Sequence, residues 1–119
     1  MRGWIGVDLD GTLAHYTPGQ PYRPDVIGEP VPAMLERVQK WLAEGRDVRI
    51  FTARVYEDGT AERRAEVRLA RLAIVTWCRQ HLNTVLAITN IKDMAMVELW
   101  DDRAVQVEAN TGKRIGEGT

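Results

Sequence analysis

The chain has 119 residues, of which 45% are hydrophobic, and both values are typical of one domain with a core of its own. The formal net charge of −1 excludes a global electrostatic attraction to nucleic acid or to anionic membranes. No apolar run approaches the roughly 18 residues of a membrane span, and Met1–Val7 is too short for a signal peptide. The single cysteine, Cys78, excludes an intramolecular disulfide, so we expect a cytoplasmic protein.

The first predicted element is a buried strand over Trp4–Leu9, which ends in a turn at Gly11. Asp8 and Asp10 lie two positions apart, so both side chains leave the strand on the same side. Two carboxylates held that close repel each other, which indicates that a positively charged partner lies between them. The next segment, 15–32, holds five prolines and two glycines and is predicted to form a long loop beside the end of this strand.

Helical and strand patterns alternate along the rest of the chain. In order, they predict a helix over Val31–Glu44, a strand over Asp47–Ala53, an arginine-rich helix over Ala61–Leu82, and strands over Thr84–Thr89, Val97–Trp100 and Ala104–Glu108. A turn at Thr111–Gly112 then indicates a hairpin at the sheet edge. This alternation predicts an α/β fold, a Rossmann-like doubly wound parallel sheet with flanking helices, with residues 1–119 forming a single domain.

Polar side chains follow the predicted strands, at the edge of the sheet where such folds bind ligands. They are Asp8 and Asp10, Thr52 with Arg54, Lys92, and Asp101 with Asp102. Converging carboxylates favour a hard cation such as Mg²⁺, which often shares its coordination shell with a phosphate. A carboxylate can also attack phosphorus, and a second one can protonate the leaving oxygen and then activate water. Hydroxyl, lysine and backbone N–H groups can bind the phosphoryl oxygens, so the set suits phosphoryl transfer.

Four segments resemble, in order, the motifs of the haloacid dehalogenase (HAD) superfamily. The sequence DLDGTL at Asp8–Leu13 is similar to the first motif, DxDGT, and IFTAR at Ile50–Arg54 is similar to the second. Lys92 in ITNIKD is similar to the lysine of the third motif. The segment ELWDDRAV resembles the fourth, an apolar strand that ends in two acidic residues. Together the four segments cover the chain from Trp4 to about Val107.

The resemblance implies a catalytic role for four residues. Asp8 would be the nucleophile that forms a phosphoaspartyl intermediate, and Asp10 would be the general acid and base. Thr52 would hydrogen-bond the phosphoryl group, and Lys92 would hold the nucleophile and the phosphate together electrostatically. Two structural alternatives stay open, because Thr52 also suits a cap at a strand end and Lys92 also suits a solvated surface position.

The resemblance further implies a Mg²⁺ site and a substrate site. The predicted metal ligands are Asp8, Asp10 through its backbone carbonyl, Asp101 and Asp102. Asp102 is expected to bind directly and Asp101 through a water, although the family leaves that order open. The predicted substrate-binding residues are Gly11, Thr52, Ala53 and Arg54. Arg54 is either a ligand for the substrate phosphate or one half of an ion pair.

The resemblance favours a capless phosphatase. The second aspartate of the first motif, Asp10, points to phosphoryl transfer rather than dehalogenation. The interval after the first motif holds a loop and one helix, and the interval after the second holds one helix, so neither is long enough for a cap domain. We therefore expect a Mg²⁺-dependent phosphohydrolase that acts on a phosphorylated small molecule or macromolecular end. Nucleic acid is expected only as a substrate, and no membrane partner is expected.

Two other functions stay open at this point. The first is a HAD-like binding or regulatory module without turnover, which would be expected to lose the nucleophile or the metal carboxylates, whereas this chain keeps them. The second is a phosphotransferase that passes the phosphoryl group to an acceptor other than water. A second copy in a homo-oligomer, or the loop Tyr16–Pro30, is expected to shield the site from water. The TAR sequence and the Asp101–Asp102 pair also resemble the phosphatase half of polynucleotide kinase-phosphatases.

Overall fold

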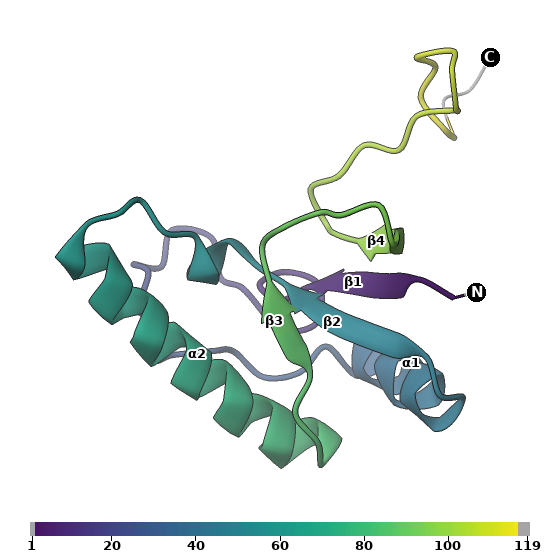
Figure 1. Cartoon of the computed structure of the whole chain (residues 1–119). Helices are drawn as coiled ribbons and strands as arrows, with labels where there is room; N and C mark the ends of the chain where they lie inside the picture. The colour runs from purple at the N-terminus through teal and green to yellow at the C-terminus, as the bar shows by residue number, and fades with distance from the viewer. Residues whose placement is uncertain (1, 117–119) are drawn as a thin grey trace.

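The computed structural model describes residues 2–116. Four strands form one parallel sheet in the order β3-β2-β1-β4 (Figure 1). The elements are β1 (Trp4–Asp8), α1 (Pro32–Ala43), β2 (Asp47–Phe51), the short 3₁₀ helix η1 (Ala53–Val55), α2 (Ala61–Leu82), β3 (Ala87–Thr89) and β4 (Met96–Trp100). The predicted α/β class is confirmed, with an all-parallel sheet flanked by helices that is compatible with a Rossmann-like doubly wound arrangement.

The first strand lies at the centre of the sheet. Val7 of β1 pairs with Ile50 of β2 on one side and with Trp100 of β4 on the other. Residues 4–7 are buried, as expected for a central parallel strand. Asp8, the last residue of β1, is only partly buried because it reaches the carboxyl edge of the sheet. This arrangement brings the ends of β1 and β4 side by side.

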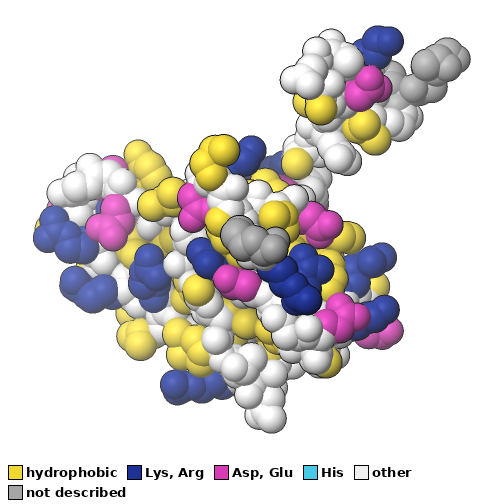
Figure 2. Space-filling view, turned by 45° about the vertical axis from the view of Figure 1, so that its right-hand side comes forward, with side chains coloured by type: hydrophobic (Ala, Val, Ile, Leu, Met, Phe, Trp, Pro, Cys, Tyr) yellow, Lys and Arg dark blue, Asp and Glu magenta, His cyan; other side chains and the backbone are white. Residues whose placement is uncertain are grey.

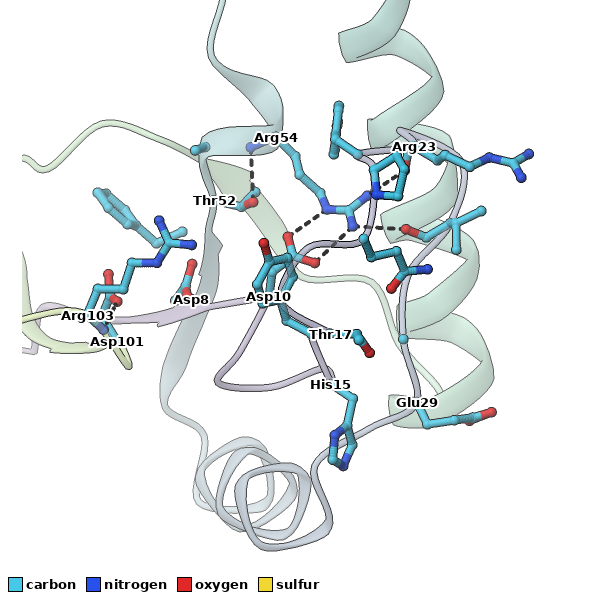
Figure 3. Close-up of a pocket in the computed structure, with 18 of the residues that line it drawn as sticks. Asp8, Asp10, His15, Thr17, Arg23, Glu29, Thr52, Arg54, Asp101 and Arg103 are labelled. Carbon is cyan, nitrogen blue, oxygen red and sulfur yellow. Dashed lines mark hydrogen bonds and ion pairs between the residues drawn. The ribbon is translucent and has the colours of Figure 1, made fainter.

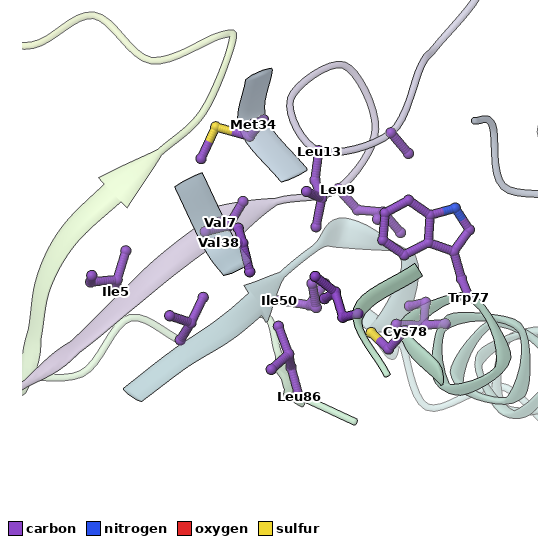
Figure 4. Close-up of a cluster of buried hydrophobic side chains, with 14 residues drawn as sticks. Ile5, Val7, Leu9, Leu13, Met34, Val38, Ile50, Trp77, Cys78 and Leu86 are labelled. Carbon is purple, nitrogen blue, oxygen red and sulfur yellow. The ribbon is translucent and has the colours of Figure 1, made fainter. Parts of the chain in front are cut away.

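Both helices pack on the same face of the sheet (Figure 1). Ile5 and Val7 of β1 and Ile50 of β2 point to this face, where they join buried residues such as Val38 of α1 and Ile74 of α2 in one cluster (Figure 4). These side chains are spaced by two along the strands and by three or four along the helices, which is the spacing of one face of each element. The cluster therefore fixes the sheet against both helices.

Local signals in the sequence set the helix ends. Pro32 opens α1, where its fixed φ suits the first turn, and Gly45 follows the helix with a φ of +79°. The Thr60 hydroxyl caps α2 by accepting a hydrogen bond from a backbone N–H, and Asn83 ends it in the left-handed region. The predicted bounds of α2 are confirmed. Within residues 2–116, no helix has the length and hydropathy that a membrane crossing requires.

The opposite face of the sheet carries no helix among the described residues. The connection from β3 to β4, residues 90–95, crosses this face, and Oδ1 of Asp93 accepts a hydrogen bond from Nε1 of Trp4 (2.8 Å). The guanidinium of Arg49 lies 4.7 Å from the centre of the Trp4 ring. A loop and an arginine therefore cover Trp4, whose neighbour Ile5 points to the helices.

The segment after β4 differs from the prediction of a fifth strand over Ala104–Glu108. It forms a small hairpin around the predicted turn, closed by the Glu108 N–H to Lys113 carbonyl hydrogen bond (2.7 Å) and an isolated antiparallel bridge. Figures 1 and 2 show this arm standing clear of the sheet. The alternating valines have a strand pattern, but no sheet edge lies beside them, so Val105 and Val107 are 58% and 54% exposed.

Candidate active site

Three of the predicted acidic residues meet at the carboxyl edge of the sheet. Asp8 ends β1, and Asp101 and Asp102 follow directly after β4, its parallel neighbour. One carboxylate oxygen from each of the three lies within 4.8 Å of the other two. Hard oxygen ligands that converge at this spacing fit Mg²⁺. These residues would therefore hold the metal that the sequence resemblance implies.

Thr12 fixes the position of Asp102 in this group. The Thr12 hydroxyl accepts a hydrogen bond from the backbone N–H of Asp102 (3.0 Å) and donates to Oδ1 of the same residue (3.1 Å). Oδ2 of Asp8 lies 3.5 Å from the hydroxyl, so Thr12 sits between the two carboxylates. A turn after β1, in which the Leu13 N–H donates to the Asp8 carbonyl (3.2 Å), holds Thr12 there.

Asp8 lies in an acidic and partly buried environment. Burial is the largest cause that raises the pKa of Asp8 to about 7. The hydrogen bond with Asp102 and the charges of Asp101, Asp102 and Asp10 raise this pKa further. A divalent cation bound here would favour the ionised carboxylate, which is the form that can act as a nucleophile. The excess of negative charge is a second feature that fits a cation.

The raised pKa of Asp8 predicts how the stability of the metal-free chain depends on pH. Between the ordinary value of 3.8 and the folded value of about 7, the native state binds a proton that the unfolded chain has released. The free energy of unfolding should therefore fall as the pH rises through this range, by about 1–2 kcal/mol for a partly solvated group, and then level off. Urea unfolding in a chelator, between about pH 4 and pH 8, measures this trend.

The matched variant for this measurement is Asp8→Asn. It cannot ionise at this position, so its stability should be less dependent on pH than that of the wild type. At about pH 8 the variant should be the more stable of the two, because the wild type then carries the ionised carboxylate beside other acids. Parallel profiles for the two proteins would contradict the assigned environment of Asp8.

Asp10 does not join the three carboxylates but pairs with Arg54 (Figure 3). Nε of Arg54 donates to Oδ2 of Asp10 (2.7 Å), and Nη2 donates to Oδ1 (2.8 Å). Burial by itself lowers the pKa of Arg54, but the hydrogen bonds and the charge of Asp10 raise it above its ordinary value. Arg54 therefore stays charged, and both carboxylate oxygens of Asp10 accept hydrogen bonds from it.

A loop over residues 16–28 covers the site on one side. The ends of this loop are held together by hydrogen bonds from the His15 N–H to the Glu29 carbonyl (2.8 Å) and from the Val31 N–H to the Leu13 carbonyl (2.8 Å). Between the loop and the strand ends lies a cavity of about 910 Å³. The aspartates at positions 8, 10 and 101 line one side of it, and loop residues such as Tyr16 and Tyr22 line the other.

Thr52 and Ala53 line the cavity at the end of β2. Thr52 is only 2% exposed, and its backbone N–H donates to the Thr89 carbonyl (2.9 Å), which joins the ends of β2 and β3. Its hydroxyl accepts a hydrogen bond from the backbone N–H of Arg54 (3.1 Å). A hydroxyl that accepts one bond keeps its own proton to donate, so Thr52 can still bind an acceptor in the cavity.

Three predicted site residues do not line the cavity: Asp102, Lys92 and Gly11. Lys92 is exposed in the connection from β3 to β4, which leaves the carboxyl edge of the sheet to reach the start of β4. The structure therefore does not bring Lys92 together with Asp8, Asp10 and Thr52. Gly11 lies against Asp102 instead, because a Cβ at this position would be 2.6 Å from Oδ2 of Asp102.

Two residues for which the sequence predicts no role, Thr12 and Arg103, lie at the site. Thr12 orients Asp102, and its signal was its position inside the DLDGTL segment. Arg103 lines the cavity, and its backbone N–H donates to Oδ1 of Asp101 (2.8 Å). Figure 3 shows the Arg103 side chain on the same side of the cavity as Asp8. A cation there balances part of the negative charge of the aspartates.

Comparison with known proteins gives the fold but no function. No protein-family model matches the chain, and no curated protein matches it. Among solved structures, a conserved protein from Bacteroides thetaiotaomicron is similar, with a TM-score of 0.55 and 20% sequence identity. The match covers 88% of this chain and 79% of the other. At this identity the likeness shows the fold alone. The α/β architecture is therefore shared with a solved protein, and the function must be argued from the site.

Proposed function

We propose that this chain is a Mg²⁺-dependent phosphohydrolase of the HAD superfamily, with Asp8 as its nucleophile. The observation that carries the proposal is the convergence of Asp8, Asp101 and Asp102 at the ends of β1 and β4. The motif resemblance implies those same residues from the amino-acid sequence alone. Agreement between a sequence motif and a spatial cluster of hard ligands supports a functional site over a chance group of acids.

Asp8 is the nucleophile in the first step of the proposed reaction. One of its carboxylate oxygens attacks the phosphorus of the substrate, the bond between phosphorus and the ester oxygen breaks, and a phosphoaspartate forms. Bound Mg²⁺ would supply positive charge that offsets the negative charge of the carboxylates and of the phosphoryl group. The Thr52 hydroxyl donates a hydrogen bond to a phosphoryl oxygen from the wall of the cavity.

Asp10 is the general acid and the general base of the proposed reaction. It gives a proton to the ester oxygen as that oxygen leaves. It then takes a proton from the water that attacks the phosphoaspartate, which releases inorganic phosphate and restores Asp8. Asp10 lines the cavity two residues from Asp8, and its side chain is 28% exposed, so it is accessible to substrate and water. The two aspartates therefore have separate roles.

The size of the cavity bears on the substrate class. A volume of about 910 Å³ is much larger than a phosphate ion needs, so the cavity has room for the organic part of a phosphate monoester. The loop 16–28 supplies aromatic, cationic and amide side chains to its wall, including Tyr22, Arg23 and Gln20. We propose a phosphorylated small molecule or a phosphorylated macromolecular end as the substrate.

Hydrolysis of p-nitrophenyl phosphate tests this function. The purified chain is expected to release p-nitrophenol with Mg²⁺, to lose this activity in a chelator, and to regain it when excess Mg²⁺ is restored. Calorimetric titration with Mg²⁺ measures metal binding independently of turnover. Addition of a small alcohol during turnover measures phosphoryl transfer, because the transferred fraction appears as an alkyl phosphate instead of inorganic phosphate.

The outcomes separate the three functions. Turnover that requires Mg²⁺ supports the phosphohydrolase, and a predominance of alkyl phosphate would instead identify a phosphotransferase. Absence of turnover on a panel of nucleotides, sugar phosphates and phosphorylated DNA ends, together with absence of Mg²⁺ binding, would contradict the proposal. That result would favour a binding module.

A further inference from the structure

We infer that Arg54 is a positioning residue, which holds the general acid Asp10 in place and ties it to the loop 16–28. The inference rests on the proposed function, because it assigns Asp10 a proton to deliver. Of the two roles that the sequence left open for Arg54, it favours one half of an ion pair over a ligand for the substrate phosphate. The hydrogen bonds of its guanidinium group are the observation that distinguishes the two roles.

All five N–H donors of the Arg54 guanidinium have an acceptor within the chain. Two go to the carboxylate of Asp10, one to each oxygen (2.7 and 2.8 Å). The other three go to the main-chain carbonyls of Arg23 (3.2 Å), Pro24 (3.4 Å) and Val26 (2.9 Å). A guanidinium group has five N–H donors in total. Arg54 therefore has no free donor for a phosphate unless one of these bonds breaks.

The surroundings of Arg54 also suit a fixed role. Its side chain is only 9% exposed, and its guanidinium lies 5.1 Å from the centre of the Tyr22 ring. Its backbone N–H is bonded to Thr52, so the start of η1 fixes its Cα beside the end of β2. Figure 3 shows the guanidinium between Asp10 and the carbonyls of the loop. An arginine held at both ends can orient the groups that it contacts.

This arrangement links proton transfer to the loop. To protonate the leaving oxygen, one carboxylate oxygen of Asp10 must carry the proton and turn toward the substrate. The planar Arg54 fork can keep its hydrogen bond to the other oxygen during this movement, which limits the orientations that Asp10 samples. The proton then passes from Asp10 to the ester oxygen, and the attacking water later returns one to Asp10. Loss of Arg54 should therefore impair the proton transfer more than it impairs the attack by Asp8.

The dependence of the rate on the leaving group measures this effect. p-Nitrophenolate leaves readily without a proton, whereas an alkoxide needs one, so an alkyl phosphate depends more on the general acid. For Arg54→Ala we expect kcat to fall by about 10-fold on p-nitrophenyl phosphate and by about 100- to 1,000-fold on an alkyl phosphate. Asp10→Asn should show the same substrate dependence. The double variant should be no worse than Asp10→Asn, because both changes remove one function.

Arg63→Ala is the matched control. Arg63 also lines the cavity and is held by main-chain carbonyls, those of Ala53, Arg54 and Tyr56, but it contacts none of the site aspartates. Its loss removes a cation from the cavity wall and should reduce kcat by a similar factor for both substrates. Arg54→Lys keeps the charge and loses the fork, so it should resemble Arg54→Ala in substrate dependence.

Hydrogen exchange provides a readout that does not depend on activity. The Val26 amide donates to the Arg23 carbonyl (3.1 Å), which also accepts from Arg54. Amide exchange in 16–28 should therefore be about 10-fold faster or more in Arg54→Ala than in the wild type, and unchanged there in Arg63→Ala.

Two results would overturn the inference. One is an equal loss for both substrates in Arg54→Ala together with a raised KM, which is expected of a residue that binds the substrate phosphate. The other is unchanged exchange in 16–28, which would show that Arg54 does not hold the loop. A wild type without turnover would count against the phosphohydrolase instead, and faster exchange in Arg54→Ala would still support the tie to the loop.

Discussion

Asp8→Asn is expected to lower kcat for p-nitrophenyl phosphate by on the order of 10⁴-fold or more in the presence of Mg²⁺. The amide has the shape of the carboxylate but is neutral, and an NH₂ group replaces one of its oxygens, so it is a much weaker nucleophile toward phosphorus. Asp8 lies at the end of the central strand, with Asp101 and Asp102 beside it, so no other carboxylate has the same access from β1. Steady-state kinetics and acid-quench detection of the phosphoenzyme measure the effect.

The control for this substitution is Asp47→Asn. Asp47 begins β2 at the opposite edge of the sheet and pairs with Arg49 (2.9 Å), so the same change of carboxylate to amide occurs there outside the site. The control should retain wild-type kinetics. Turnover that survives in Asp8→Asn would exclude Asp8 as the nucleophile or reveal a contaminating phosphatase.

Gly11→Ala is expected to have the second large effect, a loss of Mg²⁺ affinity of about 10- to 100-fold with a matching loss of activity. The added Cβ would lie 2.6 Å from Oδ2 and 2.9 Å from Cγ of Asp102. The exposed Asp102 side chain can move away, but doing so breaks its bond to Thr12 and takes it out of the three-carboxylate group. Calorimetric titration with Mg²⁺ and the phosphatase assay measure the two losses.

Gly45→Ala separates this clash from backbone strain. Gly45 has a φ of +79° against +90° for Gly11, so an alanine is strained at both positions, but no atom lies within 4 Å of a Cβ at Gly45. Both variants should lose about 1 kcal/mol of stability or more. Only Gly11→Ala should lose Mg²⁺ affinity. Equal affinities in the two variants would show that Asp102 is not a ligand of the metal.

Local patterns in the sequence were sufficient to locate the strand ends and the long helix. The apolar runs before Asp8 and before Asp101 each predicted one strand. Parallel pairing of these two strands places Asp8 beside Asp101 and Asp102. The helical pattern over Ala61–Leu82 predicted the bounds of α2, and the structure adds the Thr60 cap at its start. These features depend on neighbours within a few residues, which is why periodicity and capping predict them.

Features that depend on distant contacts were not predictable. The pair between Asp10 and Arg54 joins residues 44 positions apart, and nothing near either residue distinguishes it from a surface pair. Lys92 has the expected sequence context, but the connection to β4 must cross the sheet within a few residues and carries the lysine away from the site. Val105 and Val107 of the C-terminal arm have the alternating pattern of a strand, but this segment does not lie beside a strand of the sheet with which it could pair.

The two ends of the loop 16–28 are held together next to β1, so this loop is a separable module of the chain. Its ends are joined by main-chain hydrogen bonds beside β1, and Arg54 donates hydrogen bonds to three of its main-chain carbonyls. Main-chain acceptors are present whatever the residue, so the loop side chains that face the cavity can be exchanged while both attachments persist. Grafted loops of the same length therefore offer a way to alter substrate preference while the strand ends, and the chemistry proposed for them, stay unchanged.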